Sequence, residues 1–355
     1  MPDAVIQSER MTSLRDSPFL RACRRQSVPY TPVWLMRQAG RYQPEYRLLR
    51  ERVGFLELCR NPALAAEVTV SAAERLGVDA AIIFSDLLVV TEPLGFPVTY
   101  EKGEGPVIRR PIRRGRDVDR VRVFDPAVEL AYVLDAIRKT RAALRPGLPL
   151  IGFAGAPFTI AAYLIEGRSS RTFERVRAFM RGDEGAWNAL LGRIAPVLAR
   201  HLNAQIRAGA QAVQVFDSWV GCLSPGEYRR YVLPHSRALL RGIRRGVPVI
   251  HFGTRTGPFL ELLRDAGGTV IGVDHRVSLA EARRRLGPRV AVQGNLDPAV
   301  LLSPLAAIRR AARRVLAQAG PRPGHIFNLG HGVLPATPPA HARALVDIVH
   351  ELSSR

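Results

Sequence analysis

The sequence predicts an α/β protein that folds as a single (β/α)8 (TIM) barrel. Eight short apolar, β-branched runs recur along the chain, and a helical pattern follows each of them. The runs are almost continuously apolar, as is typical of parallel strands buried on both faces. The length of 355 residues suits one such domain. An open doubly wound sheet is the alternative, although no run leads into the Gly-x-Gly-x-x-Gly pattern of a dinucleotide-binding fold.

The elements follow one another in regular alternation. The predicted strands cover residues 33–36, 80–84, 148–153, 212–216, 247–252, 269–273, 290–293 and 325–329. The predicted helices cover residues 62–76, 128–144, 184–208, 225–245, 258–266, 279–286, 298–318 and 338–352. Two of these helices begin with capping-box patterns, Ser224 to Glu227 and Ser278 to Glu281, which fix their starting points.

One segment interrupts the alternation. Residues 91–122 hold several glycines and prolines among short β-type runs, which predicts a hairpin inserted after the second strand. No other segment marks a domain boundary, so we expect residues 1–355 to form a single catalytic domain. Within it, residues 1–17 are predicted to be a flexible N-terminal arm.

Composition predicts a soluble protein in the reducing cytoplasm. Hydrophobic residues make up 47% of the chain, yet no apolar run is long enough to span a membrane. The first thirty residues contain acidic residues and lack an apolar core, which argues against a secretory signal or a transit peptide. The three cysteines lie far apart, so neither a disulfide framework nor a cysteine-based zinc module is expected.

The net charge is unusually high. Lysine and arginine number 52 against 31 acidic residues, giving a formal charge of +21, and only Lys102 and Lys139 are lysines, which leaves 52 − 2 = 50 arginines. A nucleic-acid binder would cluster them on one face, and an enzyme for a polyanionic substrate would place a few in a cleft. The arginines run from Arg10 to Arg355, which favours compositional drift as the source of the total. We therefore expect no specific nucleic-acid partner.

A barrel of this kind carries its active site at the carboxyl ends of its strands. Polar residues and glycines follow the predicted strands at these ends, where they would meet along one rim. They are Arg37, Asp86, Gly155-Ala156-Pro157, Asp217-Ser218, Gly253-Thr254, Asp274-His275, Gly294-Asn295 and Gly330-His331.

Two long motifs carry a resemblance to a known family. Residues 32–42 read Pro-Val-Trp-Leu-Met-Arg-Gln-Ala-Gly-Arg-Tyr, and residues 152–159 read Gly-Phe-Ala-Gly-Ala-Pro-Phe-Thr before Tyr163. Shorter motifs at 84–86, 216–219, 293–298 and 328–332 follow in order. In these motifs the sequence resembles the uroporphyrinogen decarboxylase family over about residues 18 to 350.

The resemblance implies a carboxy-lyase of haem (porphyrin) biosynthesis. Such an enzyme converts the four acetate side chains of uroporphyrinogen III to methyls, which gives coproporphyrinogen III. The resemblance also implies a single-domain (β/α)8 barrel, a homodimer, and a reaction that needs no metal or organic cofactor. The tetrapyrrole is then the expected partner. The order of the four decarboxylations and the release of intermediates stay open.

The chemistry assigns a first set of residues. Loss of CO2 from a pyrrole acetate leaves a carbanion, and prior protonation of the ring carbon supplies a cationic electron sink. Asp86 can accept hydrogen bonds from pyrrole N–H groups and oppose that positive charge. Arg37 and Arg41 suit substrate carboxylates, and Arg37 also suits the departing carboxylate or the proton transfer. Arg50 is a further candidate for a carboxylate contact, with a solvated helix position as its alternative.

The remaining candidates complete the predicted site. His331 lies between two glycines and can act as an acid or bind a carboxylate. Tyr163 and Ser218 offer hydroxyl groups to a reacting acetate, and Phe153 and Phe216 suit an apolar wall for the macrocycle. Ordinary packing is the alternative for both phenylalanines, as N-capping is for Asp86. Which residue delivers each proton does not follow from the sequence.

The sequence disfavours two alternative functions. Zinc-dependent, corrinoid-linked methyltransferases of the same superfamily need His-x-Cys at a strand end and a distant cysteine. The corresponding residues here are His251-Phe252-Gly253, which lack the cysteine. A non-enzymatic basic scaffold for nucleic acid would need neither the polar strand ends nor the two long motifs. No metal ligands are therefore expected.

Overall fold

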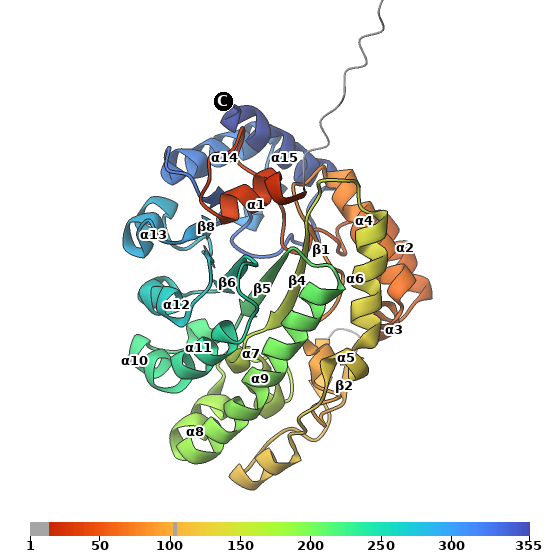
Figure 1. Cartoon of the computed structure of the whole chain (residues 1–355), viewed down its shortest axis with the longest axis vertical. Coiled ribbons are helices and arrows are strands. Elements are labelled where there is room, and N and C mark those ends of the chain that lie inside the picture. Colours follow the sequence, from red (N-terminus) through yellow and green to blue (C-terminus); the bar gives the residue numbers. More distant parts are fainter. Residues whose placement is uncertain (1–13, 102–104) are drawn as a thin grey trace, which may run out of the picture.

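A curled parallel sheet of seven strands occupies the centre of the molecule, and helices surround it (Figure 1). This computed structural model describes residues 14–101 and 105–355. The strands lie side by side in the order β1 (Ala81–Ile82), β4 (Leu150–Gly155), β5 (Ala212–Asp217), β6 (Val249–Gly253), β7 (Val270–Gly272), β8 (Ala291–Gln293) and β9 (His325–Ile326). Each strand pairs in parallel with its neighbour, as in Ile151 beside Ala212. These strands confirm seven of the eight predicted ones.

The predicted strand 33–36 is wrong as a regular strand. The structure reduces it to one parallel bridge between Val33 and Phe327. The Phe327 N–H donates to the Pro32 carbonyl at 2.8 Å, and the Asp79 N–H donates to the Val33 carbonyl at 2.8 Å. The backbone then leaves the ladder, because the Met36 N–H donates to the Asn328 side chain at 3.1 Å instead of to a strand. The segment thus lies between β9 and the residues that precede β1.

Asp79 is the buried residue that fixes this segment. Its Oδ2 accepts hydrogen bonds from the Val33 N–H and from His350 Nε2, both at 2.7 Å. Its Oδ1 accepts a hydrogen bond from the Tyr30 hydroxyl at 3.1 Å. His350 lies in the last helix, so one carboxylate joins the N-terminal segment, the edge of the sheet and the C-terminal helix. The Val33 N–H is buried and depends on this acceptor, because water does not reach it.

The helices pack around the sheet. They are α1 (Pro18–Cys23), α2 (Pro44–Arg52), α3 (Phe55–Arg60), α4 (Pro62–Leu76), α5 (Pro126–Glu129), α6 (Ala131–Ala143), α7 (Pro157–Glu166), α8 (Glu174–Gly182), α9 (Glu184–Ala208), α10 (Pro225–Glu227), α11 (Leu233–Arg241), α12 (Leu260–Ala266), α13 (Leu279–Leu286), α14 (Leu305–Ala319) and α15 (Pro339–Ser353). None of these helices in the described ranges is long and apolar enough to cross a membrane.

Three predicted helices match the structure from end to end, namely α4, α9 and α13. The capping box of Ser224 and Glu227 is confirmed, since each side chain bonds the other's backbone N–H. The predicted helix 298–318 divides into a 3-10 turn, η7 (Pro298–Leu302), and α14. Ser303 is extended because it precedes Pro304, and the residue before a proline is disfavoured in a helix.

An antiparallel pair of strands follows β1 along the chain. It consists of β2 (Val98–Glu101) and β3 (Gly105–Ile108), flanked by the 3-10 helices η2 (Leu87–Val90) and η3 (Gly115–Arg120). The Ile108 N–H donates to the Gly167 carbonyl at 2.7 Å, and the Ile112 N–H donates to the Leu164 carbonyl at 2.8 Å. These bonds attach the segment to the carboxyl end of α7. Residues 102–104 lie outside the described residues.

The predicted arm falls partly on the described residues. Residues 1–13 lie outside them, and the helical turn η1 (Leu14–Asp16) leads into Ser17, which is buried. The Ser17 side chain accepts a hydrogen bond from the Leu20 N–H and caps α1.

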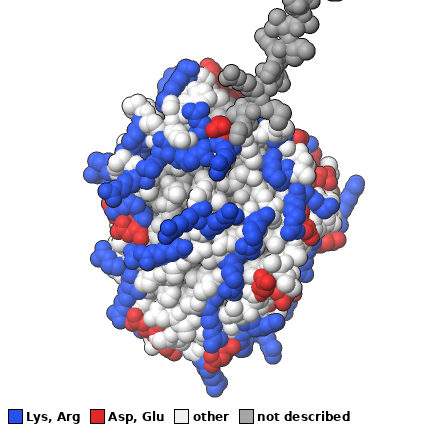
Figure 2. Space-filling model, in the orientation of Figure 1, with Lys and Arg blue, Asp and Glu red and all other residues white. Residues whose placement is uncertain are grey.

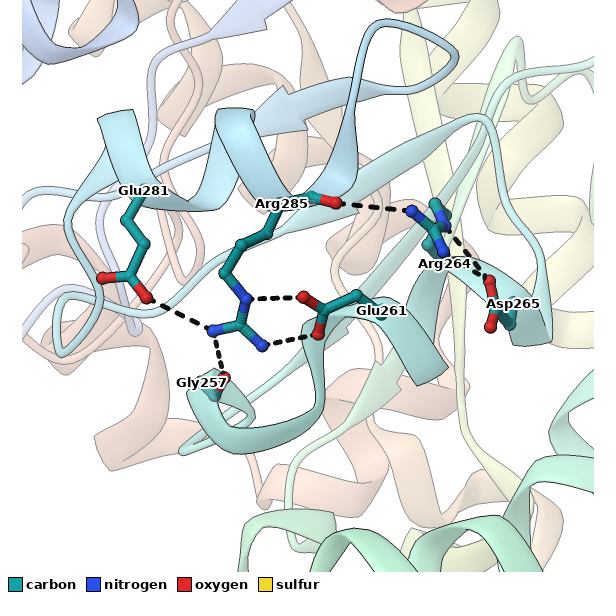
Figure 3. A network of polar contacts seen from close by, with 6 residues as sticks. All are labelled: Gly257, Glu261, Arg264, Asp265, Glu281 and Arg285. Atoms are coloured by element: carbon teal, nitrogen blue, oxygen red, sulfur yellow. Dashed lines mark hydrogen bonds and ion pairs between the residues drawn. The ribbon is translucent and has the colours of Figure 1, made fainter.

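The arginines are spread over the surface. Figure 2 shows basic side chains across the whole of one face, with acidic side chains scattered among them. Figure 3 shows one local network, in which Arg285 of α13 binds both carboxylate oxygens of Glu261 in α12 and the Gly257 carbonyl. Arg264 in turn donates to the Arg285 carbonyl. Arginine here fastens neighbouring helices, which agrees with a structural use of many of these residues.

The Asp79 contacts generate a stability prediction. Asp79→Ala leaves the buried Val33 N–H without a partner, so we expect the free energy of unfolding to fall by about 3 kcal/mol. Urea denaturation measures the loss. In the control Asp119→Ala, an ion pair with Arg193 is lost from a side chain that is 80% exposed, so the change should stay within about 1 kcal/mol. Equal effects of the two substitutions would contradict the role given to Asp79.

Candidate active site

Most of the predicted site residues follow strands, and parallel strands end at one edge of the sheet. Asp86 follows β1, Ser218 follows β5 and His331 follows β9, while Arg37 follows the bridged segment at Val33. Phe153 and Phe216 lie near the ends of β4 and β5 and are half-buried. The carboxyl edge of the sheet therefore carries a polar group from several segments far apart in the sequence.

Arg37 follows a segment that is anchored through Trp34 in a buried polar network. Trp34 Nε1 donates to Gln293 Oε1 at 2.9 Å, and Gln293 Nε2 donates to Gln214 Oε1 at 3.1 Å. The backbone at Arg37 then adopts a left-handed conformation with φ of 63°, which is uncommon for a residue other than glycine. The side chain is exposed at the edge of the sheet. Strain of this kind persists only where the surroundings impose it.

Two glycines allow the His331 loop to pack against Arg37 and against His275. A Cβ atom on Gly332 would lie 2.4 Å from Arg37 Cδ, and one on Gly330 would lie 2.2 Å from the His275 backbone nitrogen. Partial burial lowers the pKa of His331, and the positive charges of Arg37 and Arg276 lower it further. Because the shift is downward from an ordinary value near 6.5, the neutral imidazole is favoured at pH 7.

Asp86 caps a short helix and also faces the site. Its Oδ1 accepts a hydrogen bond from the Leu88 N–H at 2.7 Å, so it is an N-cap, as the alternative interpretation supposed. Burial raises the pKa of Asp86, whereas Tyr100, the Leu88 N–H and Arg37 lower it. The carboxylate thus experiences both a desolvating environment and groups that favour its charge.

Tyr163 projects from α7 beside these groups. Its ring lies 5.9 Å from the ring of Trp219, which in turn lies 5.3 Å from Phe173. Burial, with the negative charge of Asp86 as the next cause, raises the pKa of Tyr163 to about 12. The phenol is therefore protonated at neutral pH and available as a hydrogen-bond donor.

Aromatic rings line the site on two sides. Phe153 and Phe216 meet edge to face at 5.6 Å, and Phe216 lies 6.1 Å from Phe252. Elsewhere Phe84 lies 5.7 Å from Tyr46, and Phe55 lies 4.6 Å from Tyr100. These rings are half-buried or buried, and they provide apolar surface near the edge of the sheet.

The structure thus brings Arg37 within electrostatic reach of three other predicted residues, Asp86, Tyr163 and His331, and Asp86 within reach of Tyr163. Arg41 lies on an exposed turn whose carbonyl accepts a hydrogen bond from Arg47.

The other two predicted polar residues make different contacts. Arg50 bonds the Val53 carbonyl and lies over the ring of Phe55 at 5.5 Å. The Ser218 carbonyl accepts a hydrogen bond from Thr254 Oγ1 at 2.6 Å. The described contacts of Arg50 and Ser218 do not link them to Asp86.

The sequence interpretation missed several neighbours of the site. Tyr100 lies in β2 beside Asp86, and no pattern in the sequence indicates which way this hairpin residue points. Arg276 pairs with the buried Asp274 at 3.2 Å and lies near His331. The expectation that site residues follow the carboxyl ends of the strands did indicate Asp274-His275, and Arg276 is the next residue in the chain. Among the described residues, no three metal-ligating side chains gather at one point.

Comparison with known proteins identifies the family of this chain. The family model described as uroporphyrinogen decarboxylase (URO-D) matches residues 14–352. A uroporphyrinogen decarboxylase of Sorangium cellulosum is 56% identical over 335 residues, which cover 94% of this chain and 96% of the relative. One of Carboxydothermus hydrogenoformans is 53% identical over 337 residues, 95% of this chain and 96% of the relative. The chain belongs to the uroporphyrinogen decarboxylase family. The resemblance carried by its motifs is thereby confirmed.

A solved structure shares the fold of this family member. It is a methyltransferase from Methanosarcina mazei, with a TM-score of 0.79 and 22% identity, and the match covers 96% of this chain and 98% of the other. At this level of identity the likeness concerns the fold alone.

Gly332 offers a test of how the site is assembled. Gly332→Ala adds a methyl group where Arg37 Cδ lies, so Arg37 must move. We expect kcat/KM to fall about tenfold or more, because small displacements of a positioned group are costly, while the unfolding midpoint changes little. Steady-state kinetics and thermal denaturation measure the two effects. Gly192→Ala in α9, where the new methyl group meets nothing within 4 Å, should leave kcat/KM unchanged. An unchanged kcat/KM in Gly332→Ala would refute the close packing of Gly332 against Arg37.

Proposed function

We propose that this chain is a carboxy-lyase that decarboxylates the four acetate side chains of uroporphyrinogen III to methyls and releases coproporphyrinogen III. The observation that carries the proposal is the grouping of Asp86, Arg37, Tyr163 and His331 at the carboxyl edge of the sheet in a member of this family. One carboxylate among cationic and hydroxyl groups suits a substrate with anionic arms and a pyrrole ring that becomes cationic when it is protonated.

The fold we propose for this activity is a (β/α)8 barrel. The hydrogen bonds of Pro32 and Val33 to Phe327 and Asp79 support treating residues 32–34 as the eighth member of the sheet. The β2–β3 pair is then an insertion after the second strand of the barrel. Active sites of such barrels lie at the edge where the polar groups gather here.

Asp86 has the central electrostatic role in the proposed mechanism. Protonation of a pyrrole carbon creates a cation, which accepts the electron pair of the breaking C–C bond as CO2 leaves. The ionised Asp86 carboxylate binds the pyrrole N–H groups and stabilises the cation. Protonation of the resulting methylene carbon forms the methyl group, and loss of the first proton from the ring carbon restores the pyrrole. The reaction balances with one proton gained and one CO2 lost at each acetate.

The cationic side chains bind the carboxylates. Arg37 lies beside both Asp86 and His331 and orients the reacting acetate or takes part in its proton transfer. Arg41 and Arg50 bind further carboxylates of the substrate. His331, neutral at pH 7 when the site is empty of anions, gains a proton more readily once a carboxylate lies beside it. It then serves as an acid or as a carboxylate ligand.

Hydroxyl and aromatic groups complete the proposed site. Tyr163 and Ser218 donate hydrogen bonds to the reacting acetate. Phe153 and Phe216 pack against the macrocycle, and their partial exposure leaves ring surface for it. No metal or organic cofactor enters the scheme, since the protonated substrate is its own electron sink.

The proposal extends to assembly and location. By analogy with the family we propose a homodimer in the cytoplasm, with the tetrapyrrole as the specific partner. A zinc-dependent methyltransferase is the alternative function that the sequence analysis raised, and the solved structure named a methyltransferase shares the fold alone. His251-Phe252-Gly253 in β6 disfavours it, because glycine stands where that chemistry needs a thiolate.

The direct test is incubation of the purified protein with uroporphyrinogen III under anaerobic conditions. The products are oxidised to porphyrins, and their carboxyl groups are counted by chromatography and mass spectrometry. Loss of four carboxyl groups supports the proposal, and recovery of the unchanged octacarboxylate overturns it.

Asp86 should be needed in its charged form. Asp86→Asn is isosteric but neutral, so we expect turnover to fall about 100-fold or more with little change in stability. Because the pKa of Asp86 is raised, the wild-type enzyme should lose activity as pH falls through a value above that of an ordinary aspartate, about 3.9. A pH series of kcat/KM measures this. Near wild-type turnover in Asp86→Asn would remove Asp86 from the mechanism.

A paired comparison separates the site arginines from surface ones. Arg37→Gln and Arg41→Gln should each weaken substrate binding or turnover sharply, since a bidentate carboxylate ligand is lost. Arg309→Gln with Arg313→Gln, on α14, should spare the reaction, although Arg309 loses its ion pair with Glu351. Substrate titrations of both sets decide the matter. Equal losses in the two sets would mean that the diffuse charge of the surface binds the substrate.

A further inference from the structure

Tyr100 presents a buried hydroxyl beside Asp86. The residue lies in β2, and its hydroxyl oxygen makes no well-aligned hydrogen bond within the described residues. A buried hydroxyl without a partner is unfavourable and calls for an explanation. The Asp86 carboxylate is the acceptor next to this hydroxyl. The contact between the two groups lowers the pKa of Asp86 and raises that of Tyr100.

Packing fixes the tyrosine ring from one side. Its ring centroid lies 4.6 Å from that of Phe55, which lies 6.2 Å from that of Phe84. Phe84 stands two residues before Asp86 in the chain, so the rings connect the hairpin to the segment that carries the carboxylate. Ring-to-ring contacts of this kind restrict both position and orientation.

The hairpin fixes the tyrosine from the other side. Tyr100 pairs with Pro106 of β3, and β3 continues into the bonds that attach Ile108 to Gly167 at the end of α7. The helix α7 carries Tyr163, which also lies near Tyr100. The ring contact with Phe55 and the strand pairing with Pro106 are thus two independent attachments that hold Tyr100.

The groups that surround Asp86 come from five segments. They are the Leu88 N–H of η2, Arg37 after the bridged segment, Cys59 of α3, Tyr163 of α7 and Tyr100 of β2. Among those that favour the charged carboxylate, Tyr100 acts more strongly than the Leu88 N–H and Arg37. Burial and the charge of Asp86 both raise the pKa of Tyr100, so its hydroxyl keeps its proton and remains a donor.

We propose that Tyr100 is a positioning residue for the decarboxylation: its hydroxyl donates a hydrogen bond to the Asp86 carboxylate and holds it toward the substrate. The inference rests on the proposed function, because it acts through the role given there to Asp86. It extends that function to a side chain of the hairpin. Tyr100 itself touches neither the reacting carbon nor the departing CO2 in this scheme.

The conservative variant Tyr100→Phe tests the hydroxyl alone, because it keeps the ring and its contact with Phe55. Without the donor, the pKa of Asp86 rises and the charged form persists over a narrower range. We expect the acid limb of kcat/KM to move upward by about one pH unit. At the plateau, kcat/KM should fall about three- to tenfold, which reflects a less well oriented carboxylate.

A second tyrosine–aspartate pair supplies the matched control. Tyr30 donates to Asp79 at 3.1 Å, away from the carboxyl edge of the sheet. Tyr30→Phe removes a hydrogen bond of the same type, so it should lower the thermal midpoint without moving the pH profile. If Tyr100→Phe behaves like this control, with a lower midpoint and an unmoved acid limb, Tyr100 is structural and the inference is overturned.

Different outcomes overturn the proposed function and the role of Tyr100. Wild-type protein that leaves uroporphyrinogen III unchanged overturns the function itself, whatever the variants do. Active wild type with an unshifted Tyr100→Phe profile overturns only the role of Tyr100. If the variant turns over too slowly for a profile, binding of uroporphyrinogen III is followed against pH by tryptophan fluorescence, which Trp219 reports from 5.9 Å beyond Tyr163. An upward shift of the binding limb supports the inference, and an unmoved limb refutes it.

Discussion

The carboxylate of Asp79 is the contact on which the geometry of the site depends. It binds Tyr30, Val33 and His350, and thereby holds the N-terminal segment against the edge of the sheet and the last helix. Because Val33 lies four residues before Arg37, this contact sets where the guanidinium emerges. The same segment is bonded to Phe327, four residues before His331. Two ends of a long chain are thus brought to one place by a buried acceptor far from the substrate edge.

At that edge, the surroundings of Asp86 and those of His331 act on the two side chains in opposite ways. Asp86 is the carboxylate on the β1 side, and burial works against its charge while Arg37 and Tyr100 favour it. His331 is affected in the opposite sense, since the cationic Arg37 and Arg276 discourage a further positive charge. An anionic substrate arm placed between them would relieve the repulsion, and a cationic pyrrole would relieve the desolvated carboxylate. A substrate with anionic arms and a ring that becomes cationic would therefore relieve both electrostatic costs.

The sequence indicated much of this arrangement, for reasons that are clear in physical terms. Buried parallel strands need continuous apolar runs, so β1 and β4 to β9 could be located, and the strand-end rule then led to Asp86, Ser218 and His331. The strand predicted at 33–36 is wrong because its residues are apolar and buried, as in a strand, while the Met36 N–H donates to the side-chain amide of Asn328 and not to a neighbouring strand. Tyr100 was missed because the direction of a side chain in a short hairpin depends on register, which an apolar pattern of four residues does not fix.

The excess of arginine also has a local physical basis. A guanidinium can satisfy its donors on carbonyl oxygens as well as on carboxylates. Arg25 donates to the Pro288 carbonyl, and Arg200 donates to that of Phe124. Each such bond fastens a loop or a helix end without an acidic partner, so arginines can accumulate while aspartate and glutamate do not. What distinguishes Arg37 from these residues is therefore its placement, with a carboxylate and an imidazole within reach of its charge.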